Sequence, residues 1–190
     1  GQDVFVSTPD GDLRQMKGGS TVLDFAFDIH SNIGLKCSGG LINGKMVSIK
    51  EVLKTGDTVE IITSKNQKPA EGWLNFVVTS KARSKIKQKL KEQENILAAA
   101  GKELLYRRLR NWKLEMSDTD LGLLVKKYKF HTANELFGAI GREEIDLAEI
   151  KTFLQHDDAG AVASVGDKTA MSQNSGDAGD ILEIGGKGNL

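Results

Sequence analysis

Near its N-terminus the chain reads Ser20-Thr21-Val22-Leu23-Asp24-Phe25-Ala26-Phe27-Asp28-Ile29-His30-Ser31-Asn32-Ile33-Gly34, and this stretch sets the architecture of the first part of the molecule. Apolar residues recur in it at the i, i+3, i+4, i+7 spacing of one helix face, at Val22, Leu23, Phe25, Ala26, Ile29 and Ile33. Ser20 or Thr21 can cap the N-terminal end, and Gly34 is the expected C-terminal stop. The pattern predicts one amphipathic helix. Asp24 and Asp28 share a helix face that we expect to be solvated.

Strand-like segments surround this predicted helix. Residues 3–8 and 13–16 flank a turn rich in Pro, Asp and Gly, which is typical of a hairpin. Asn43-Gly44 is a strong signal for a second hairpin, and residues 58–63 alternate as a closing strand. The order hairpin, helix, hairpin, strand predicts a ubiquitin-like β-grasp domain over residues 1–64, in an α+β chain.

After residue 64 the strand pattern gives way to helical periodicity. Pro69 and Gly72 exclude a helix over residues 65–78, but the segment also contains Trp73 and other large apolar residues, so we expect a packed connector. An all-α helical domain is predicted over residues 79–154, with helices at 79–95, 96–112, 118–128, 133–140 and 143–154. Expected caps are Thr79 or Ser80, Ser117, and Thr132 with Glu135.

The last part of the chain has a different composition. Gly, Ala, Ser and Asp dominate residues 155–180, which predicts a flexible acidic linker. Residues 181–190 contain a short strand-like run, Ile181–Ile184, which suggests the truncated start of a further domain. Because the chain also begins at Gly1 rather than at a methionine, we expect it to be part of a longer protein.

A formal net charge of zero conceals an uneven distribution of charge. Residues 65–113 carry 13 basic and 4 acidic side chains, net +9, whereas residues 1–64 carry 6 basic and 8 acidic, net −2. Residues 114–154 are net −3 and residues 155–190 net −4. The central segment therefore has a positive electrostatic footprint suited to an anionic partner.

Several functional classes find no support in the residues. Cys37 is the only cysteine, which fits a reducing cytoplasmic location and is best explained as a small buried side chain. His30, His131 and His156 lie far apart with no cysteine cluster beside them, so we expect no metal site, no cofactor and no catalytic group. No apolar run is long enough for a membrane span, and no signal peptide is evident.

Three stretches resemble the TGS domain of the RelA/SpoT homologues: residues 4–13, residues 21–34 and residues 53–63. TGS domains also occur in threonyl-tRNA synthetases and Obg-like GTPases. The segment Trp73–Ile86 is similar to the junction between the TGS and the helical domain of RelA/SpoT homologues, and it favours that family. The resemblance covers about residues 3–154 and implies a regulatory part of a (p)ppGpp synthetase/hydrolase. The hydrolase and synthetase motifs of the family are absent from this sequence, so we expect no catalysis from it.

The resemblance also implies candidate binding residues. In the stringent-factor branch, the histidine of the Ile-His-Ser pattern, here His30, contacts the 3′ CCA end of uncharged tRNA on the ribosome. The residues alone favour a histidine that hydrogen-bonds locally at a helix end, and only the resemblance favours RNA contact. Lys36 is either a phosphate contact or a solvated strand residue. The basic helix, with Lys81, Arg83, Lys85 and Lys87, predicts contact with tRNA or ribosomal RNA backbone, although a solvated helix face explains such charge runs as well.

Two other functions stay open. TGS domains of the bifunctional branch resemble docking sites for acyl carrier protein and relay inhibition to the catalytic domains, so a protein-interaction module is the main alternative. A cationic patch suits an acidic carrier protein as well as RNA. An appended TGS domain of a threonyl-tRNA synthetase is disfavoured by the Trp73–Ile86 segment and by the missing editing signature.

Overall fold

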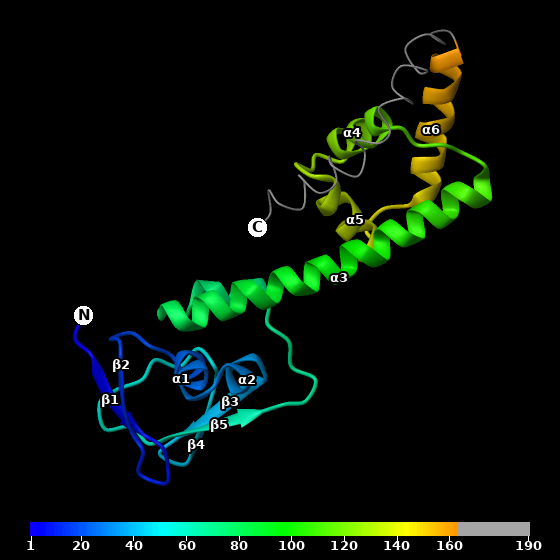
Figure 1. The fold of residues 1–190 in the computed structure, drawn as a ribbon. Coiled ribbons are helices and arrows are strands. Elements are labelled where there is room, and N and C mark those ends of the chain that lie inside the picture. The colour runs from blue at the N-terminus through cyan, green and yellow to red at the C-terminus, as the bar shows by residue number, and fades with distance from the viewer. Residues whose placement is uncertain (163–190) are drawn as a thin grey trace. The chain divides into compact units, whose positions relative to one another are not determined.

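The computed structural model describes residues 1–162, with side chains to residue 156. The described part of the chain divides into two compact units, which we call the first unit (residues 1–92) and the second unit (from residue 93 onward). Each unit has its own hydrophobic core. The elements are shown in Figure 1.

Five short strands build the sheet structure of the first unit: β1 (Val4–Ser7), β2 (Leu13–Met16), β3 (Cys37–Ile42), β4 (Lys45–Val47) and β5 (Val59–Thr63). Strands β1 and β2 form an antiparallel hairpin, and the other three are antiparallel in the order β4-β3-β5. A parallel bridge between Ser7 and Thr58 joins the two groups. Asn43 (φ 53°) and Gly44 (φ 81°) form the β3–β4 turn, as expected of Asn-Gly between paired strands.

Helix α1 (Val22–Ile29) packs on β3 and β5 and supplies the centre of the first core. Phe25 and Phe27 are fully buried, together with Val22, Leu23 and Ala26. A helix lying on short paired strands, followed by a helical region, confirms the predicted α+β fold with a β-grasp first domain. The predicted apolar residues Val22, Leu23, Phe25 and Ala26 are buried, but Asp24 and Phe27 are buried as well, so residues 22–27 are covered on all sides and not on one face alone.

The predicted end of this helix was wrong. Helix α1 ends at Ile29, His30 is extended (φ −167°, ψ 142°), and a second helix, α2 (Ser31–Leu35), follows at once. Gly34 lies inside α2 and is not a stop. A Cβ at this position would lie 2.3 Å from Phe27 Cγ, so the glycine allows α2 to pack directly on the buried ring.

Two apolar side chains of the connector are buried, Trp73 at 6% exposure and Val77 at 3%. The connector contains a 3-10 turn, η1 (Glu71–Asn75), and leads into α3 (Ser80–Trp112). The predicted break near residue 95 is absent, and α3 is one continuous helix of 33 residues. No proline or capping geometry interrupts residues 92–100, so the backbone hydrogen bonds continue.

The second unit is helical, as predicted. Helices α4 (Asp118–Lys127), α5 (Ala133–Gly141) and α6 (Leu147–Val162) pack with the second part of α3. Ser117 caps α4, and the Thr132 hydroxyl accepts from the Glu135 N–H at the start of α5. Helix α6 begins at Leu147 instead of Glu143, whose φ of 61° is incompatible with a helix. The helix covers residues 155–162 of the predicted linker; residues 163–180 and the strand-like residues 181–190 lie outside the described residues.

Helices α3 and α5 meet through glycines. A Cβ at Gly101 would lie 1.8 Å from Phe137 O, and one at Gly141 would lie 2.1 Å from Leu97 O. The backbones therefore approach closer than any side chain permits. This contact explains why α3 tolerates a glycine in its interior, where it otherwise costs about 1 kcal/mol relative to alanine.

We predict that Gly101→Ala lowers the free energy of unfolding of the second unit by about 2–3 kcal/mol, because the methyl group has no space against the α5 backbone. Gly122→Ala is the matched control, since nothing lies within 4 Å of its Cβ position in α4. The control should be neutral or stabilising by about 0.5–1 kcal/mol. Urea unfolding followed by circular dichroism measures both, and equal stability of the two variants would contradict the glycine contact.

Candidate nucleic-acid interface

The site begins with a buried carboxylate that connects α1 to the start of α3. Asp24 is fully buried, which corrects the expectation of a solvated helix edge. Its Oδ2 accepts from the backbone N–H (2.9 Å) and the hydroxyl (3.1 Å) of Thr21, which completes the capping box of α1. The same carboxylate accepts from the N–H groups of Val78 (3.1 Å) and Thr79 (3.0 Å) and from the Thr79 hydroxyl (2.8 Å).

Thr79 in turn caps α3. Its hydroxyl oxygen accepts from the Ala82 N–H at 3.2 Å while donating to Asp24. One buried carboxylate thus supports the first turns of two helices. The i, i+3 spacing of Thr21 and Asp24 signals the capping box in the sequence, but no local pattern reveals the contact with residues 78–79.

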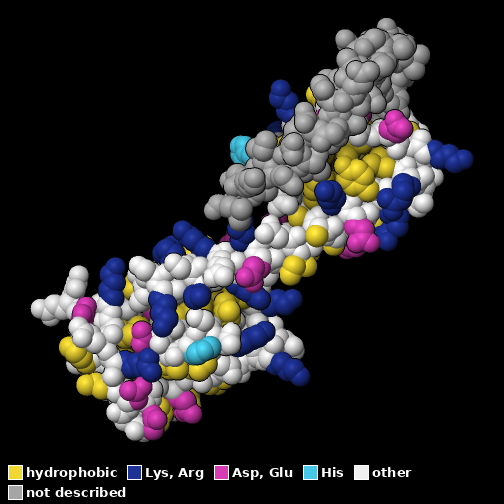
Figure 2. All heavy atoms as spheres, viewed as in Figure 1, with side chains coloured by type: hydrophobic (Ala, Val, Ile, Leu, Met, Phe, Trp, Pro, Cys, Tyr) yellow, Lys and Arg dark blue, Asp and Glu magenta, His cyan; other side chains and the backbone are white. Residues whose placement is uncertain are grey.

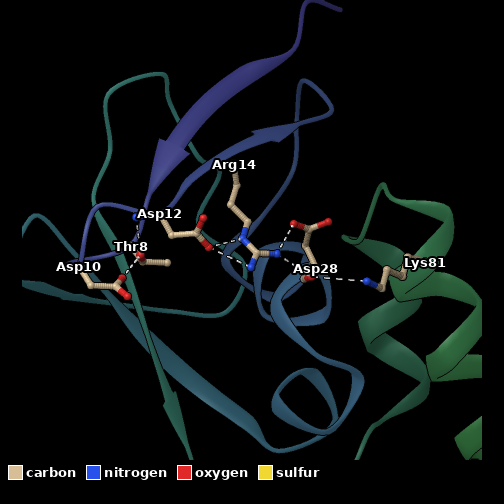
Figure 3. Close-up of polar contacts among 6 residues, drawn as sticks. All are labelled: Thr8, Asp10, Asp12, Arg14, Asp28 and Lys81. Atoms are coloured by element: carbon tan, nitrogen blue, oxygen red, sulfur yellow. Dashed lines mark hydrogen bonds and ion pairs between the residues drawn. The ribbon is translucent and has the colours of Figure 1, made fainter.

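The other end of α1 is held by cations. Arg14, on β2, donates through Nη1 to the Asp28 carbonyl oxygen (3.0 Å) and to Asp28 Oδ2 (3.1 Å). Its Nε and Nη2 each lie 3.0 Å from Asp12 Oδ2. Lys81, on α3, donates to the same Asp28 carbonyl at 3.4 Å (Figure 3). Arg14 and Asp28 were not identified from the sequence as parts of a site.

His30 lies two residues further along, at the corner between α1 and α2. Its side chain is exposed, and its Nδ1 accepts from the Asn32 N–H at 3.0 Å, which caps α2. The local hydrogen bond allowed by the sequence is therefore present. Within the described residues Nε2 has no hydrogen-bond partner, so the outer edge of the ring is available to a ligand.

Lys36 is the C-cap of α2, not a strand residue. Its ammonium group donates to the carbonyl oxygens of Lys65 (3.0 Å) and Gln67 (3.2 Å) in the connector. An ammonium has three donors, so one is left for an external acceptor. In this structure Lys36 holds the connector against α2.

The cations of α3 lie on two flanks of the helix. Ala82 and Ile86 are fully buried, and Lys81 and Lys85 follow one side of this buried stripe while Arg83 and Lys87 follow the other. Lys81, Lys85 and Lys87 are exposed, whereas Arg83 is half-buried and its Nη2 donates to the carbonyls of Leu74 (3.2 Å) and Val77 (3.1 Å). Figure 2 shows lysine and arginine side chains gathered along this part of the chain.

The structure therefore brings together some of the six candidate residues. Lys81 reaches the carbonyl two residues before His30, so both residues lie at the C-terminal end of α1. Lys36 and Arg83 contact different parts of the connector. Arg107, Arg108 and Arg110 are exposed on the part of α3 that belongs to the second unit.

Other potential chemistries have little support in the described residues. No group of three or more His, Cys, Asp or Glu side chains among them is arranged to hold a metal ion. Trp73 is a core residue, as expected, and Trp112 packs against the second core beneath Lys151, whose Nζ lies 5.6 Å from the ring centroid. None of the described helices is long and apolar enough to cross a membrane.

Cys37 is fully buried on β3, and burial raises the pKa of its thiol to about 11. Only the thiolate is nucleophilic, so we predict that the native protein reacts with an aromatic disulfide at pH 8 much more slowly than a free cysteine. Addition of about 6 M urea should restore fast reaction. A fast reaction of the native protein would contradict the packing around β3.

We predict that Asp24→Asn destabilises the first unit by about 2–4 kcal/mol, because the amide replaces a charged acceptor of several hydrogen bonds with a weaker one. Asp120→Asn is the matched control. Asp120 completes the capping box of α4 with Ser117, and its hydrogen bonds within the described residues stay inside this box. We expect Asp120→Asn to lower the free energy of unfolding of the second unit by about 1 kcal/mol. Thermal unfolding measures both, and similar losses would show that the contact with residues 78–79 contributes little.

Family comparisons agree with the division of the chain into a first unit that contains the strands and a second, helical unit. Residues 4–63 match the model of the TGS domain, and residues 89–155 match that of the RelA/SpoT AH domain. The first match covers the strands with α1 and α2. The second covers most of α3 and the helices that pack with it.

Curated relatives carry names from one family. A guanosine-3′,5′-bis(diphosphate) 3′-pyrophosphohydrolase of Aquifex aeolicus is 42% identical over 150 residues, which is 78% of this chain and 21% of the relative. A GTP pyrophosphokinase of Escherichia coli K12 is 36% identical over 203 aligned positions, 98% of this chain and 27% of the relative. One of Myxococcus xanthus is 42% identical over 116 residues, 60% of this chain and 15% of the relative.

The chain thus spans about a quarter or less of the length of these relatives. The AH-domain model and these names point to the same family, and the two domain models match the strand-containing first part of the chain and the helices that follow it. The chain belongs to the RelA/SpoT homologues, and its described residues form a TGS domain and an AH domain, a stringent-response regulatory region.

Proposed function

We propose that this region binds RNA and does no chemistry of its own. In this proposal His30 contacts the 3′ CCA end of uncharged tRNA, and the cations of α3 contact tRNA or ribosomal RNA backbone. Binding then controls the catalytic half of a (p)ppGpp synthetase or hydrolase, the activities named for the relatives. A cytoplasmic location is part of the proposal, because tRNA and ribosomes are found there.

The observation that carries the proposal is the position of His30. The ring is exposed at a corner between two helices, and the Asn32 N–H occupies one of its nitrogen atoms. An imidazole held in this way can stack on an unpaired base and use its free nitrogen for a ribose hydroxyl or a phosphate. A free CCA end offers all of these groups. An aminoacyl group on the terminal ribose would add bulk at the same place, which supports discrimination by exclusion.

The charge of the neighbouring helix supports an anionic ligand. Lys81 lies beside the His30 corner, and Lys85 follows it on the same flank of α3. Phosphate contacts by such lysines release counterions, so the affinity should fall with added salt. Lys36, Arg83 and Lys87 remain in the proposed interface as contacts for RNA backbone further from the corner.

A protein ligand is the second candidate. The same exposed lysines on α3 complement an acidic surface, so acyl carrier protein or an acidic face of the catalytic domains can occupy them. A protein ligand leaves His30 without a base to stack on. The match of residues 89–155 to the RelA/SpoT AH domain argues against a threonyl-tRNA synthetase.

We predict that His30→Glu weakens binding of a CCA-ended RNA hairpin about tenfold or more, since it replaces a stacking ring with a charge that repels phosphate. His131→Glu, at an exposed histidine of the second unit, is the control and should bind like the wild type. NMR titration at two salt concentrations measures the dissociation constants.

Equal binding by wild type and His30→Glu, or binding that does not depend on salt, would refute the RNA site. The same titration with acyl carrier protein separates the two candidates. Saturable binding of the carrier protein that Lys85→Glu removes and His30→Glu leaves unchanged would favour the protein ligand.

A further inference from the structure

At the C-terminal end of α1, the carbonyl oxygen of Asp28 accepts hydrogen bonds from side chains that lie outside the helix. Carbonyl groups in the last turn of a helix have no partner within the helix, and a basic residue nearby usually compensates. The last turn of α1 contains no basic residue. Arg14 from β2 and Lys81 from α3 meet instead at the carbonyl oxygen of Asp28, at 3.0 and 3.4 Å.

Of these two cations, Arg14 is fixed more firmly. Its guanidinium is bound on one side by Asp12 and on the other by both the carbonyl and the carboxylate of Asp28. The side chains of Arg14 and Asp28 are 28% and 35% exposed, so the pair is partly shielded from water. The hydrogen bonds to Asp28 and Asp12 raise the pKa of Arg14.

His30 depends on this end of the helix. Its backbone N–H still donates to Ala26 O at 3.2 Å, but its own φ and ψ are extended, and the chain turns there into α2. The direction of the ring is therefore set by where the last turn of α1 lies. Figure 3 shows Arg14 joining the β1–β2 hairpin to that turn.

We propose that Arg14 is a positioning residue for His30: it acts through Asp28 to fix the corner between α1 and α2 without touching the ligand. The functional half of this inference rests on the RNA site proposed above. The structural half, that the guanidinium controls the geometry around His30, stands without it.

Arg14 also has an electrostatic effect that must be separated from positioning. Its removal leaves the carboxylates of Asp12 and Asp28 without a close counter-ion beside the place where a phosphate would bind. Their repulsion alone would weaken RNA binding. Asp28→Asn removes one of these charges, so the double variant Arg14→Gln/Asp28→Asn distinguishes a lost charge from a displaced corner.

The experiment compares Arg14→Gln with Lys45→Gln, an identical change of charge at an exposed residue of β4. The reporter is the amide resonance of Asn32, because that N–H donates to His30 Nδ1. We expect Arg14→Gln to shift this resonance and to weaken binding of the CCA-ended hairpin about three- to tenfold, while Lys45→Gln does neither. Arg14→Lys, which keeps the charge but loses the forked geometry, should give an intermediate shift.

The outcomes separate the two proposals. An Asn32 resonance that is unchanged in Arg14→Gln overturns the positioning role, whatever happens to RNA affinity. Full recovery of affinity in the double variant assigns the effect to charge and also overturns it. If the wild type binds no RNA, the proposed function fails, and the Asn32 resonance alone then decides whether Arg14 sets the corner.

Discussion

The first unit depends on a carboxylate that is out of contact with water. Asp24 accepts from Thr21, three positions before it, and from Val78 and Thr79, more than fifty positions after it. A buried charge is tolerated only when hydrogen bonds replace its hydration, so this set of donors has to be complete. Because Thr79 also caps α3, the position where the long helix begins is tied to the position where α1 begins.

This arrangement explains how the candidate interface is assembled. Asp24 sets the start of α3 beside α1, and from there Lys81 reaches the other end of α1 at Asp28. Arg14 approaches the same carbonyl from the hairpin. The corner that carries His30 is therefore defined by hydrogen bonds from a strand and from a helix, and not by α1 alone.

Much of the architecture could be predicted from local patterns. The capping signals at Thr21, Ser117 and Thr132 and the Asn43-Gly44 turn depend on neighbouring residues, and all four are present in the structure. The errors have a shared cause. Gly34 was predicted to end a helix, and a helix break was predicted near residue 95. Both predictions failed because a sequence pattern does not show which residues pack against each other. Gly34 is required by the Phe27 ring, and α3 continues because nothing along its backbone ends it.

For the candidate site, the sequence by itself determined which residue types are available: a histidine at the end of a helix, an excess of cations over residues 65–113, and a pattern that identifies the family. Only the tertiary structure decided their use. It buried Asp24, engaged Lys36 and Arg83 with backbone carbonyls, and placed Arg14 and Lys81 at one acceptor. The physical reason is that charge and helix periodicity are properties of neighbouring residues, whereas desolvation and hydrogen bonding depend on residues that are distant in the chain.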